Sequence, residues 1–277
     1  MKSSLRAFAL CLVAVSASCA HVPSEKERAE ASAEYKAALS LVHEAQRSAV
    51  EGDPVKQDLK YRLALESLLK SLGLDEQSHE THYLLGLVYF SGFKRHLEAE
   101  RHLNRALKLK RDDYPEADNL LGSVLVDAGR PEEALPHFER ARSNLLYKTP
   151  YYSEQELGWA KYKLGRLDEA ATHLQSALLA QPDLCGGYIK LAEIEEARAN
   201  YVRVATVLSD FLSRCDSDRL RDQCGQPLLA WGYYRLGMIR LKAGETTAAS
   251  DALRTCTTRF AALPVAAECE RSLKLLP

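Results

Sequence analysis

The chain of 277 residues repeats one pattern of small and bulky residues five times, at spacings of 34 to 45 residues. In each copy a small residue lies within one amphipathic helical stretch, and a small–x3–bulky–x2–small run follows in the next. The copies are Gly86 with Ala99/Leu103/Ala106, Gly122 with Ala134/Phe138/Ala141, Gly158 with Ala170/Leu174/Ala177, Ala192 with Val204/Leu208/Phe211, and Gly237 with Ala249/Leu253/Cys256. The 4-then-3 spacing puts each run on one helix face, and the first small residue lets that helix come close. Such a helix pair cannot bury its apolar face alone, so the copies must stack on one another.

A period near 34 residues is typical of tetratricopeptide repeats, in which each repeat is a helical hairpin. Glycine-containing turns separate the two helical stretches of several copies, at residues 128–131, 164–168 and 243–246. Strand-like alternation of any length does not interrupt the pattern. We therefore expect an all-α fold, a right-handed superhelical solenoid of about six helical hairpins plus a C-terminal capping helix.

One continuous solenoid is expected over residues 35–276. Its first hairpin, with a turn at residues 51–54, keeps the repeated pattern poorly and would serve as an N-terminal cap. Pro136 falls about two turns into an expected helix, where it should destabilise the fold unless it lies in the first turn. The expected repeats cover residues 35–77, 79–113, 115–149, 150–183, 184–216 and 227–259, and residues 264–276 form the cap.

The first 19 residues have the features of an export signal. Basic residues at Lys2 and Arg6 precede an apolar stretch over residues 7–15 and a small-residue exit. The apolar stretch is shorter than the roughly 20 residues that a membrane-spanning helix needs. We therefore expect a signal peptide and not a membrane-spanning helix.

The end of this leader resembles a bacterial lipobox, in which a cysteine is acylated and becomes the mature N-terminus. Cys19 follows three small residues, although Ser16 stands where leucine is usual. We expect lipidation at Cys19, and the alternative is ordinary secretion with cleavage after Ala20. The charged residues 20–34 would then form a flexible tether between the membrane and the solenoid.

Five further cysteines all follow position 184, and an exported chain meets an oxidising environment in which disulfides form. Cys185 should open one helix and Cys215 should close its antiparallel partner, so hairpin geometry brings the two together. Cys256, late in the last repeat, can likewise meet Cys269 on the capping helix. A Cys215–Cys224 bridge is the competing arrangement, and otherwise Cys224 is left unpaired. No CxxC pair or Cys/His cluster is present, which argues against a bound metal.

The sequence lacks the usual signals of catalysis. It has no glycine-rich phosphate loop, no nucleophile elbow and no HExxH motif. Its formal net charge of −1 gives no indication of a nucleic-acid surface. We expect a protein that is not an enzyme, needs no cofactor, and binds neither nucleic acid nor a small-molecule substrate. Its function should reside in its surfaces.

The inner groove of such a solenoid is lined by the first helix of each repeat. Several groove-facing positions carry aromatic or polar side chains that the stacking of repeats does not require, and exposed aromatics beside polar groups favour a protein or peptide site. Ordinary packing inside a tightly curled superhelix is the alternative, and we prefer it for Trp231. The expected groove residues are Tyr83, Leu87, Phe90, Asn119, Tyr152, Gln155, Trp159 and Tyr162, with Ser123 and Val126 at equivalent positions.

One stretch of the chain resembles a known family more specifically. The segment from Asn144 to Trp159 reads NLLYKTPYYSEQELGW, which is similar to a lengthened repeat junction of the tetratricopeptide lipoproteins of type IV pilus biogenesis, the pilotins of the PilF, PilW and Tgl kind. The Cys185-Gly-Gly-Tyr188 stretch and the later cysteines look most like the myxobacterial members. The resemblance covers about residues 80–275 and the leader. The insertion around Cys224 departs from it.

The resemblance implies a function in assembly. A lipoprotein of this family would sit at the outer membrane, face the periplasm, and help the subunits of the pilus secretin to localise or multimerise there. The alternative is a generic periplasmic adaptor that scaffolds other cell-envelope proteins, such as peptidoglycan-remodelling enzymes.

Overall fold

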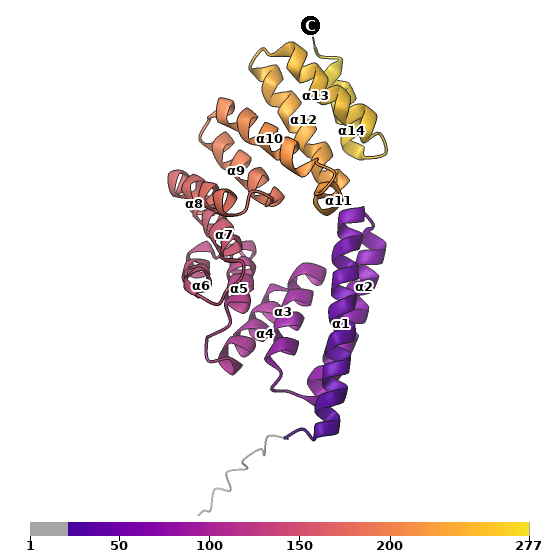
Figure 1. Cartoon of the computed structure of the whole chain (residues 1–277), viewed down its shortest axis with the longest axis vertical. Coiled ribbons are helices and arrows are strands. Elements are labelled where there is room, and N and C mark those ends of the chain that lie inside the picture. Colours follow the sequence, from indigo (N-terminus) through magenta and orange to yellow (C-terminus); the bar gives the residue numbers. More distant parts are fainter. Residues whose placement is uncertain (1–21, 277) are drawn as a thin grey trace, which may run out of the picture.

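The computed structural model describes residues 22–276, which form fourteen helices and contain no strand within that range. The helices pair into antiparallel hairpins that stack side by side along a strongly curved array (Figure 1). The all-α solenoid expected from the repeats is confirmed. The leader, with Cys19 as its expected lipidation site, lies outside the described residues. No described helix is long and apolar enough to cross a bilayer.

Six hairpins make up the array, with one short extra helix and one cap. The first three hairpins are α1 (Glu25–Glu51) with α2 (Pro54–Leu74), α3 (His79–Phe93) with α4 (His96–Leu109), and α5 (Pro115–Asp127) with α6 (Pro131–Ser143). The other three are α7 (Pro150–Lys163) with α8 (Leu167–Ala180), α9 (Cys185–Ala197) with α10 (Tyr201–Cys215), and α12 (Gln226–Lys242) with α13 (Thr246–Arg259). The insertion holds α11 (Arg221–Cys224), and α14 (Pro264–Leu273) covers the last hairpin.

The expected flexible tether is wrong from residue 25 onward, because α1 begins there. Ser24 caps the helix: its hydroxyl accepts a hydrogen bond from the Glu27 amide at 3.2 Å, and the Glu27 carboxylate accepts from the Ser24 amide at 2.7 Å. The residues that follow are mostly Glu, Lys, Arg and Ala, which are strong helix formers. Ala31 is buried, and its carbonyl accepts a hydrogen bond from Ser71 of α2. This stretch therefore belongs to the folded body.

The repeated small residues mark the points where the two helices of a hairpin touch. A Cβ atom added at Gly122 would lie 2.6 Å from Cε1 of Phe138, and one at Gly86 would lie 2.6 Å from Cγ of Leu103. Both distances are shorter than van der Waals contact, so a larger residue would push the hairpin apart. The small and bulky residues of one copy are thus an interlock between its two helices.

Pro136 lies inside α6, five residues after its first residue, and not in the first turn. It therefore lacks a helical hydrogen bond, although the helix continues to Ser143. The destabilising position expected from the sequence is the one the structure shows.

Both cysteine pairs favoured by hairpin geometry are bonded in the structure. Cys185 and Cys215 have their Cα atoms 5.9 Å apart, and those of Cys256 and Cys269 are 6.2 Å apart. Cys224 on α11 is a free, half-buried thiol. The competing Cys215–Cys224 bridge is not formed.

The curvature brings the first hairpin back against the insertion (Figure 1). A Cβ atom added at Gly225, directly after α11, would lie 3.1 Å from the carbonyl oxygen of Val50 near the end of α1. A cleft of about 650 Å³ lies at this contact, between residues of α1 such as Arg47 and residues 221–227. The two ends of the array therefore meet.

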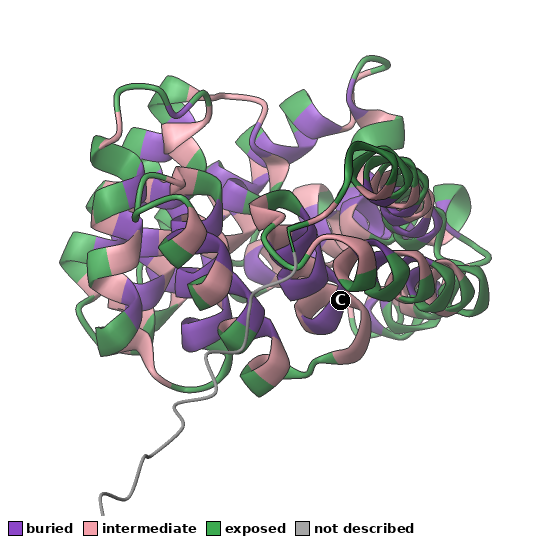
Figure 2. Ribbon diagram, turned by 90° about the horizontal axis from the view of Figure 1, so that it is seen from below, coloured by how far each residue is buried: buried purple, intermediate pink, exposed green. Residues whose placement is uncertain are grey.

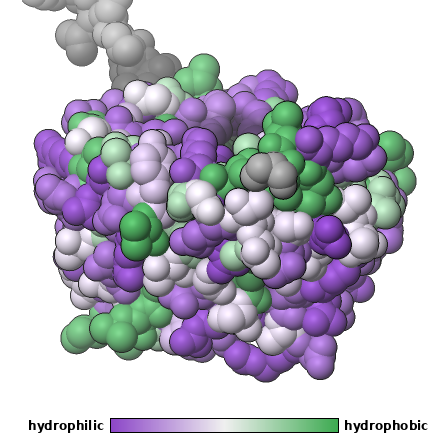
Figure 3. Space-filling model, turned by 90° about the horizontal axis from the view of Figure 1, so that it is seen from above, coloured by the Kyte–Doolittle hydropathy of each residue, from purple (hydrophilic) through white to green (hydrophobic). Residues whose placement is uncertain are grey.

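Buried residues form stripes along the helices, and the outward faces are exposed (Figure 2). Viewed from the end that carries α13 and α14, the surface is mainly hydrophilic, with apolar side chains beside the end of the chain (Figure 3).

Candidate protein-binding groove

A pocket of about 440 Å³ opens on the inner side of the array, where the first helices of four successive hairpins come together. These helices, α3, α5, α7 and α9, lie on the side of the array that faces α1 (Figure 1). We call this pocket the groove pocket. It is lined by Phe90, Ser123, Val126, Asp127, Glu156, Trp159, Lys163 and Lys190.

Trp159 forms an aromatic platform in the pocket. Its ring centroid lies 4.9 Å from that of Tyr162, one turn further along α7. The Nζ atoms of Lys163 and Lys190 lie 4.6 and 5.4 Å from the centre of the Trp159 ring, within the range of a cation–π interaction. Lys190 also pairs with the Glu156 carboxylate. An apolar ring flanked by cations can contact both the apolar and the acidic groups of a bound polypeptide.

Phe90, near the end of α3, also lines the pocket. Lys94 Nζ lies 4.9 Å from the centre of its ring. His96 Nε2 lies 2.7 Å from the Asp127 carboxylate, which ties the start of α4 to the end of α5. The His96 ring lies 6.1 Å from the Phe90 ring, so Phe90 contacts a residue that is itself linked to α5.

Polar side-chain pairs join the first helices of successive repeats. In each pair the two partners are 34 residues apart in the sequence, which is one repeat. The Ser153 hydroxyl donates to the Asn119 side-chain oxygen at 2.8 Å, and Lys190 donates to Glu156. These pairs fix the register of α5, α7 and α9 along the groove.

Gln155, next to these polar pairs on α7, has a side-chain oxygen without a hydrogen-bond partner. Its side chain is buried, and Nε2 donates to Glu156 at 2.8 Å. Its Oε1 is the one buried side-chain N or O atom without a partner among residues 22–276, and a Cβ atom at Gly187 would lie 3.1 Å from it. An unpaired buried acceptor destabilises a fold by about 1–3 kcal/mol. Gln155 therefore packs between α7 and α9 and does not line the groove pocket.

Other expected groove residues also lie outside the pocket. Tyr83 packs on the core, 5.3 Å from the ring of Tyr114, and burial raises the pKa of Tyr83 to about 12. Leu87 packs on the same core. Tyr152 is 43 % exposed and contacts Tyr151 at a centroid distance of 4.8 Å. Of the eight expected residues the pocket brings together Phe90 and Trp159, with Tyr162 beside them.

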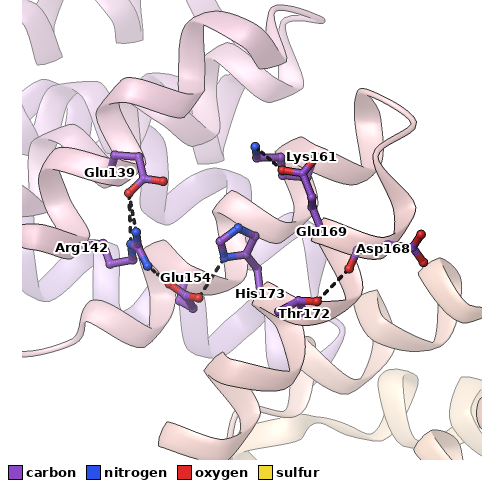
Figure 4. Close-up of polar contacts among 8 residues, drawn as sticks. All are labelled: Glu139, Arg142, Glu154, Lys161, Asp168, Glu169, Thr172 and His173. Carbon is purple, nitrogen blue, oxygen red and sulfur yellow. Dashed lines mark hydrogen bonds and ion pairs between the residues drawn. The ribbon is translucent and has the colours of Figure 1, made fainter.

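Helix α7, which carries Trp159, is held from both sides by charged side chains (Figure 4). The Glu154 carboxylate accepts from Arg142 of α6 at 3.1 Å and contacts His173 of α8 at 2.9 Å. Arg142 also pairs with Glu139 within α6. Lys161 of α7 donates to Glu169 of α8 at 2.7 Å. The position of the helix that carries Trp159 is therefore set by side-chain contacts with α6 and α8.

The charged residues of the groove pocket were missed by sequence reasoning. Glu156, Lys163 and Lys190 were not among the expected groove residues, and no groove positions were assigned to the repeat that contains Lys190. A signal was present, because Glu156 and Lys190 have opposite charges and are one period of 34 residues apart. Trp231 lies outside the pocket and packs on the hydrophobic core of the later hairpins, which runs from Ala170 to Phe260. The guanidinium carbon of Arg235 lies 5.0 Å from the centre of its ring.

Comparisons with known proteins agree with the repeat architecture. Residues 94–145 match the model of a tetratricopeptide-repeat family. The structure is similar to PilW, a widely conserved type IV pilus biogenesis factor, with a TM-score of 0.68 and 20 % identity over 86 % of this chain and 97 % of that chain. It is also similar to PilF of Pseudomonas aeruginosa, with a TM-score of 0.62 and 16 % identity over 90 % of this chain and 100 % of that chain.

The same fold occurs in an unrelated assembly. A chain of the APC/C hetero-tetramer Cut9–Hcn1 matches with a TM-score of 0.58 and 16 % identity over 90 % of this chain and 46 % of that chain. A search of curated proteins by sequence found no match. At these identities the comparisons show the fold, a tetratricopeptide solenoid like those of PilW and PilF, and function has to be argued from the site.

Proposed function

We propose that this chain is a non-catalytic assembly factor of type IV pilus biogenesis, a pilotin that binds secretin subunits through the groove pocket. The observation that carries the proposal is the fit over whole chains: the fold spans 97 % of PilW and 100 % of PilF. The leader and the repeat-junction segment at residues 144–159 support the same assignment.

The pocket supports a role in binding an extended polypeptide. Trp159 and Phe90 provide apolar contact area, and Lys163 and Lys190 provide charge at the rim. Because α7 is held in place by Glu154 and Lys161, the platform is formed before a client arrives, which lowers the entropy lost on binding.

Acylation of Cys19 would hold the solenoid at the outer membrane, facing the periplasm. Mass spectrometry of the mature N-terminus tests this part of the proposal. An acylated Cys19 is the expected result, and a free Ala20 or His21 at the N-terminus would contradict lipidation.

The secretin role is tested by gene deletion and by a single substitution in the groove. Deletion should remove secretin multimers and surface pili while secretin monomers persist. Trp159→Ala should weaken co-purification with secretin by at least about tenfold, because a central aromatic side chain in such a site contributes 2 kcal/mol or more.

Tyr201→Ala is the matched control. Tyr201 is 45 % exposed on α10, and Lys242 Nζ lies 5.8 Å from the centre of its ring, so it too is an exposed aromatic beside a lysine, outside the groove pocket. It should leave secretin assembly unchanged. Normal multimers in the deletion strain would overturn the proposal, and co-purified peptidoglycan hydrolases in place of secretin would favour the periplasmic adaptor.

A further inference from the structure

Three cysteine sulfurs cluster where the insertion meets the preceding hairpin. The Sγ atoms of Cys185, Cys215 and Cys224 all lie within 4.8 Å of one another. Two of them form a disulfide and the third is a free thiol on α11. Cys185 and Cys224 are both half-buried and pack against the same apolar core. A nucleophile is therefore held beside the bond that it can attack.

We propose that this cluster is a site of internal thiol–disulfide exchange. The Cys224 thiolate attacks Sγ of Cys215, a Cys215–Cys224 bond forms, and the Cys185–Cys215 bond breaks. Cys185 leaves as a thiolate and takes up the proton that Cys224 released. The chain holds one disulfide and one thiol here before and after the step, so no oxidant or reductant is consumed.

Helix termini set the direction of the exchange. Cys185 is the first residue of α9, where the positive end of the helix dipole stabilises a thiolate. Cys215 is the last residue of α10, where the dipole has the opposite effect. Because the sulfur with the more stable thiolate leaves faster, attack on Cys215 with release of Cys185 is preferred.

The burial of Cys224 keeps the exchange slow. Burial, with a smaller contribution from Asp216, raises the pKa of Cys224 to about 11, so at pH 7 about one thiol in 10,000 is ionised. The thiolate fraction, and with it the rate, should rise about tenfold per pH unit. The charged and titratable groups around α11 are Asp216, Asp218, Arg221, Asp222, Tyr233 and Arg259 on its own side, and Arg47 and Glu51 across the cleft on α1.

The exchange would change how the two ends of the array are joined. Cys215 and Cys224 are nine residues apart (224 − 215), so their bond ties α11 to the end of α10 and releases the start of α9. Gly225, the next residue, is the one that packs against Val50 of α1. The exchange would therefore change the covalent attachment of the segment at residues 224–225, which contacts α1.

Alkylation trapping tests the proposal on the full-length chain purified under oxidising conditions. The protein is incubated with iodoacetamide at pH 7, 8 and 9, quenched with acid and mapped by peptide mass spectrometry without reduction. We expect alkylated Cys185 together with a Cys215–Cys224 disulfide, at a rate that rises with pH. Cys224→Ser should show no alkylation at Cys185 over the same time.

A second variant keeps the test decisive if trapping is slow. Cys185→Ser should be isolated with a Cys215–Cys224 disulfide, because the two remaining sulfurs are already neighbours. Label on Cys224 alone in the wild-type chain, or on Cys215, would overturn the proposed exchange. Free thiols at both Cys215 and Cys224 in Cys185→Ser would overturn it as well.

Discussion

The two halves of the array are held together by different means. The first core runs from Ala38 on α1 to Ala160 on α7, and the second from Ala170 on α8 to Phe260. In the first half the α3–α4 and α5–α6 hairpins interlock through glycine, as Gly122 does with Phe138, and residues 22–184 contain no cysteine. In the second half the α12–α13 hairpin keeps such a glycine, Gly237 against Leu253, but the α9–α10 hairpin does not, and two disulfides cross-link this half.

The hairpin of α9 and α10 shows what this difference means. Its copy of the pattern has Ala192 in place of glycine and ends in Phe211 in place of a small residue. Phe211 fills the space above Gly232 of the next hairpin, where an added Cβ would be in contact with its ring. The interlock is thus shared with a neighbour, and the Cys185–Cys215 bond secures the hairpin itself. Where local packing is less complete, a covalent bond restricts the unfolded chain instead.

The largest expected effect comes from breaking an interlock. Phe138→Ala removes a fully buried ring and should lower the free energy of unfolding by about 3–5 kcal/mol. The chain has two tryptophans, Trp159 in the first half and Trp231 in the second, so Trp231→Phe and Trp159→Phe backgrounds report each half by fluorescence. The urea midpoint from Trp159 should fall further than that from Trp231. Equal shifts would mean that the two halves unfold as one unit.

Removing a disulfide should have a slightly smaller effect, in the other half. The double variant Cys185→Ser/Cys215→Ser opens a loop with a sequence separation of 30 and should lower stability by about 3–4 kcal/mol. Opening the Cys256–Cys269 loop, with a separation of 13, should lower it by about 3 kcal/mol. The Trp231 midpoint reports the change, with Cys224→Ser as the control that keeps both bridges. An unchanged midpoint would refute the role assigned to the bridges.

The smallest expected effect is a loss of stability in mild acid, which should be confined to the first half. His82 and His102 are buried with their Nδ1 atoms 3.0 Å apart, and burial lowers the pKa of both, that of His102 to about 4. Because the folded state favours neutral imidazoles, this stability is complete above about pH 6.5 and is lost as the pH falls toward 4. We expect a loss of about 2–3 kcal/mol in the first half between pH 7 and pH 4.

The second half should respond at lower pH. Burial alone would raise the pKa of Asp216, but hydrogen bonds from Arg259, Tyr233 and Arg221 outweigh it and lower this pKa to about 2. That contribution is present above about pH 4 and is lost as the pH falls through 2. The Trp159 midpoint should therefore fall between pH 7 and 4 while the Trp231 midpoint holds. A His102→Gln variant whose Trp159 midpoint keeps the same pH dependence would contradict this assignment.

Much of the fold was predictable because the interlock is local. Gly122 and Phe138 are 16 residues apart (138 − 122), and their contact follows from two helices and one turn. The Cys185–Cys215 bond follows from the same hairpin geometry. The start of α1 was mispredicted because its charged residues were taken as a tether, although Ser24 and Glu27 form a capping box.

The candidate site was less predictable, because its members come from four hairpins. Phe90 and Trp159 were expected on groove-facing positions, and the pocket unites them. Gln155 and Tyr83 were also expected on groove-facing positions, but neighbouring helices of the curved stack cover them, so their side chains pack in the interior. A repeat pattern specifies which face a residue lies on, but not how closely the next repeat covers that face.

The sequence by itself determined the helical hairpins, their interlocks and the cysteines that face each other within a hairpin, since each depends on spacing along one or two helices. The tertiary structure alone decided the meeting of Val50 with Gly225, the approach of Cys224 to a disulfide, and the lysines around Trp159. These contacts depend on the rotation from one repeat to the next. Small rotations add up over six hairpins, and no local pattern in the chain records their sum.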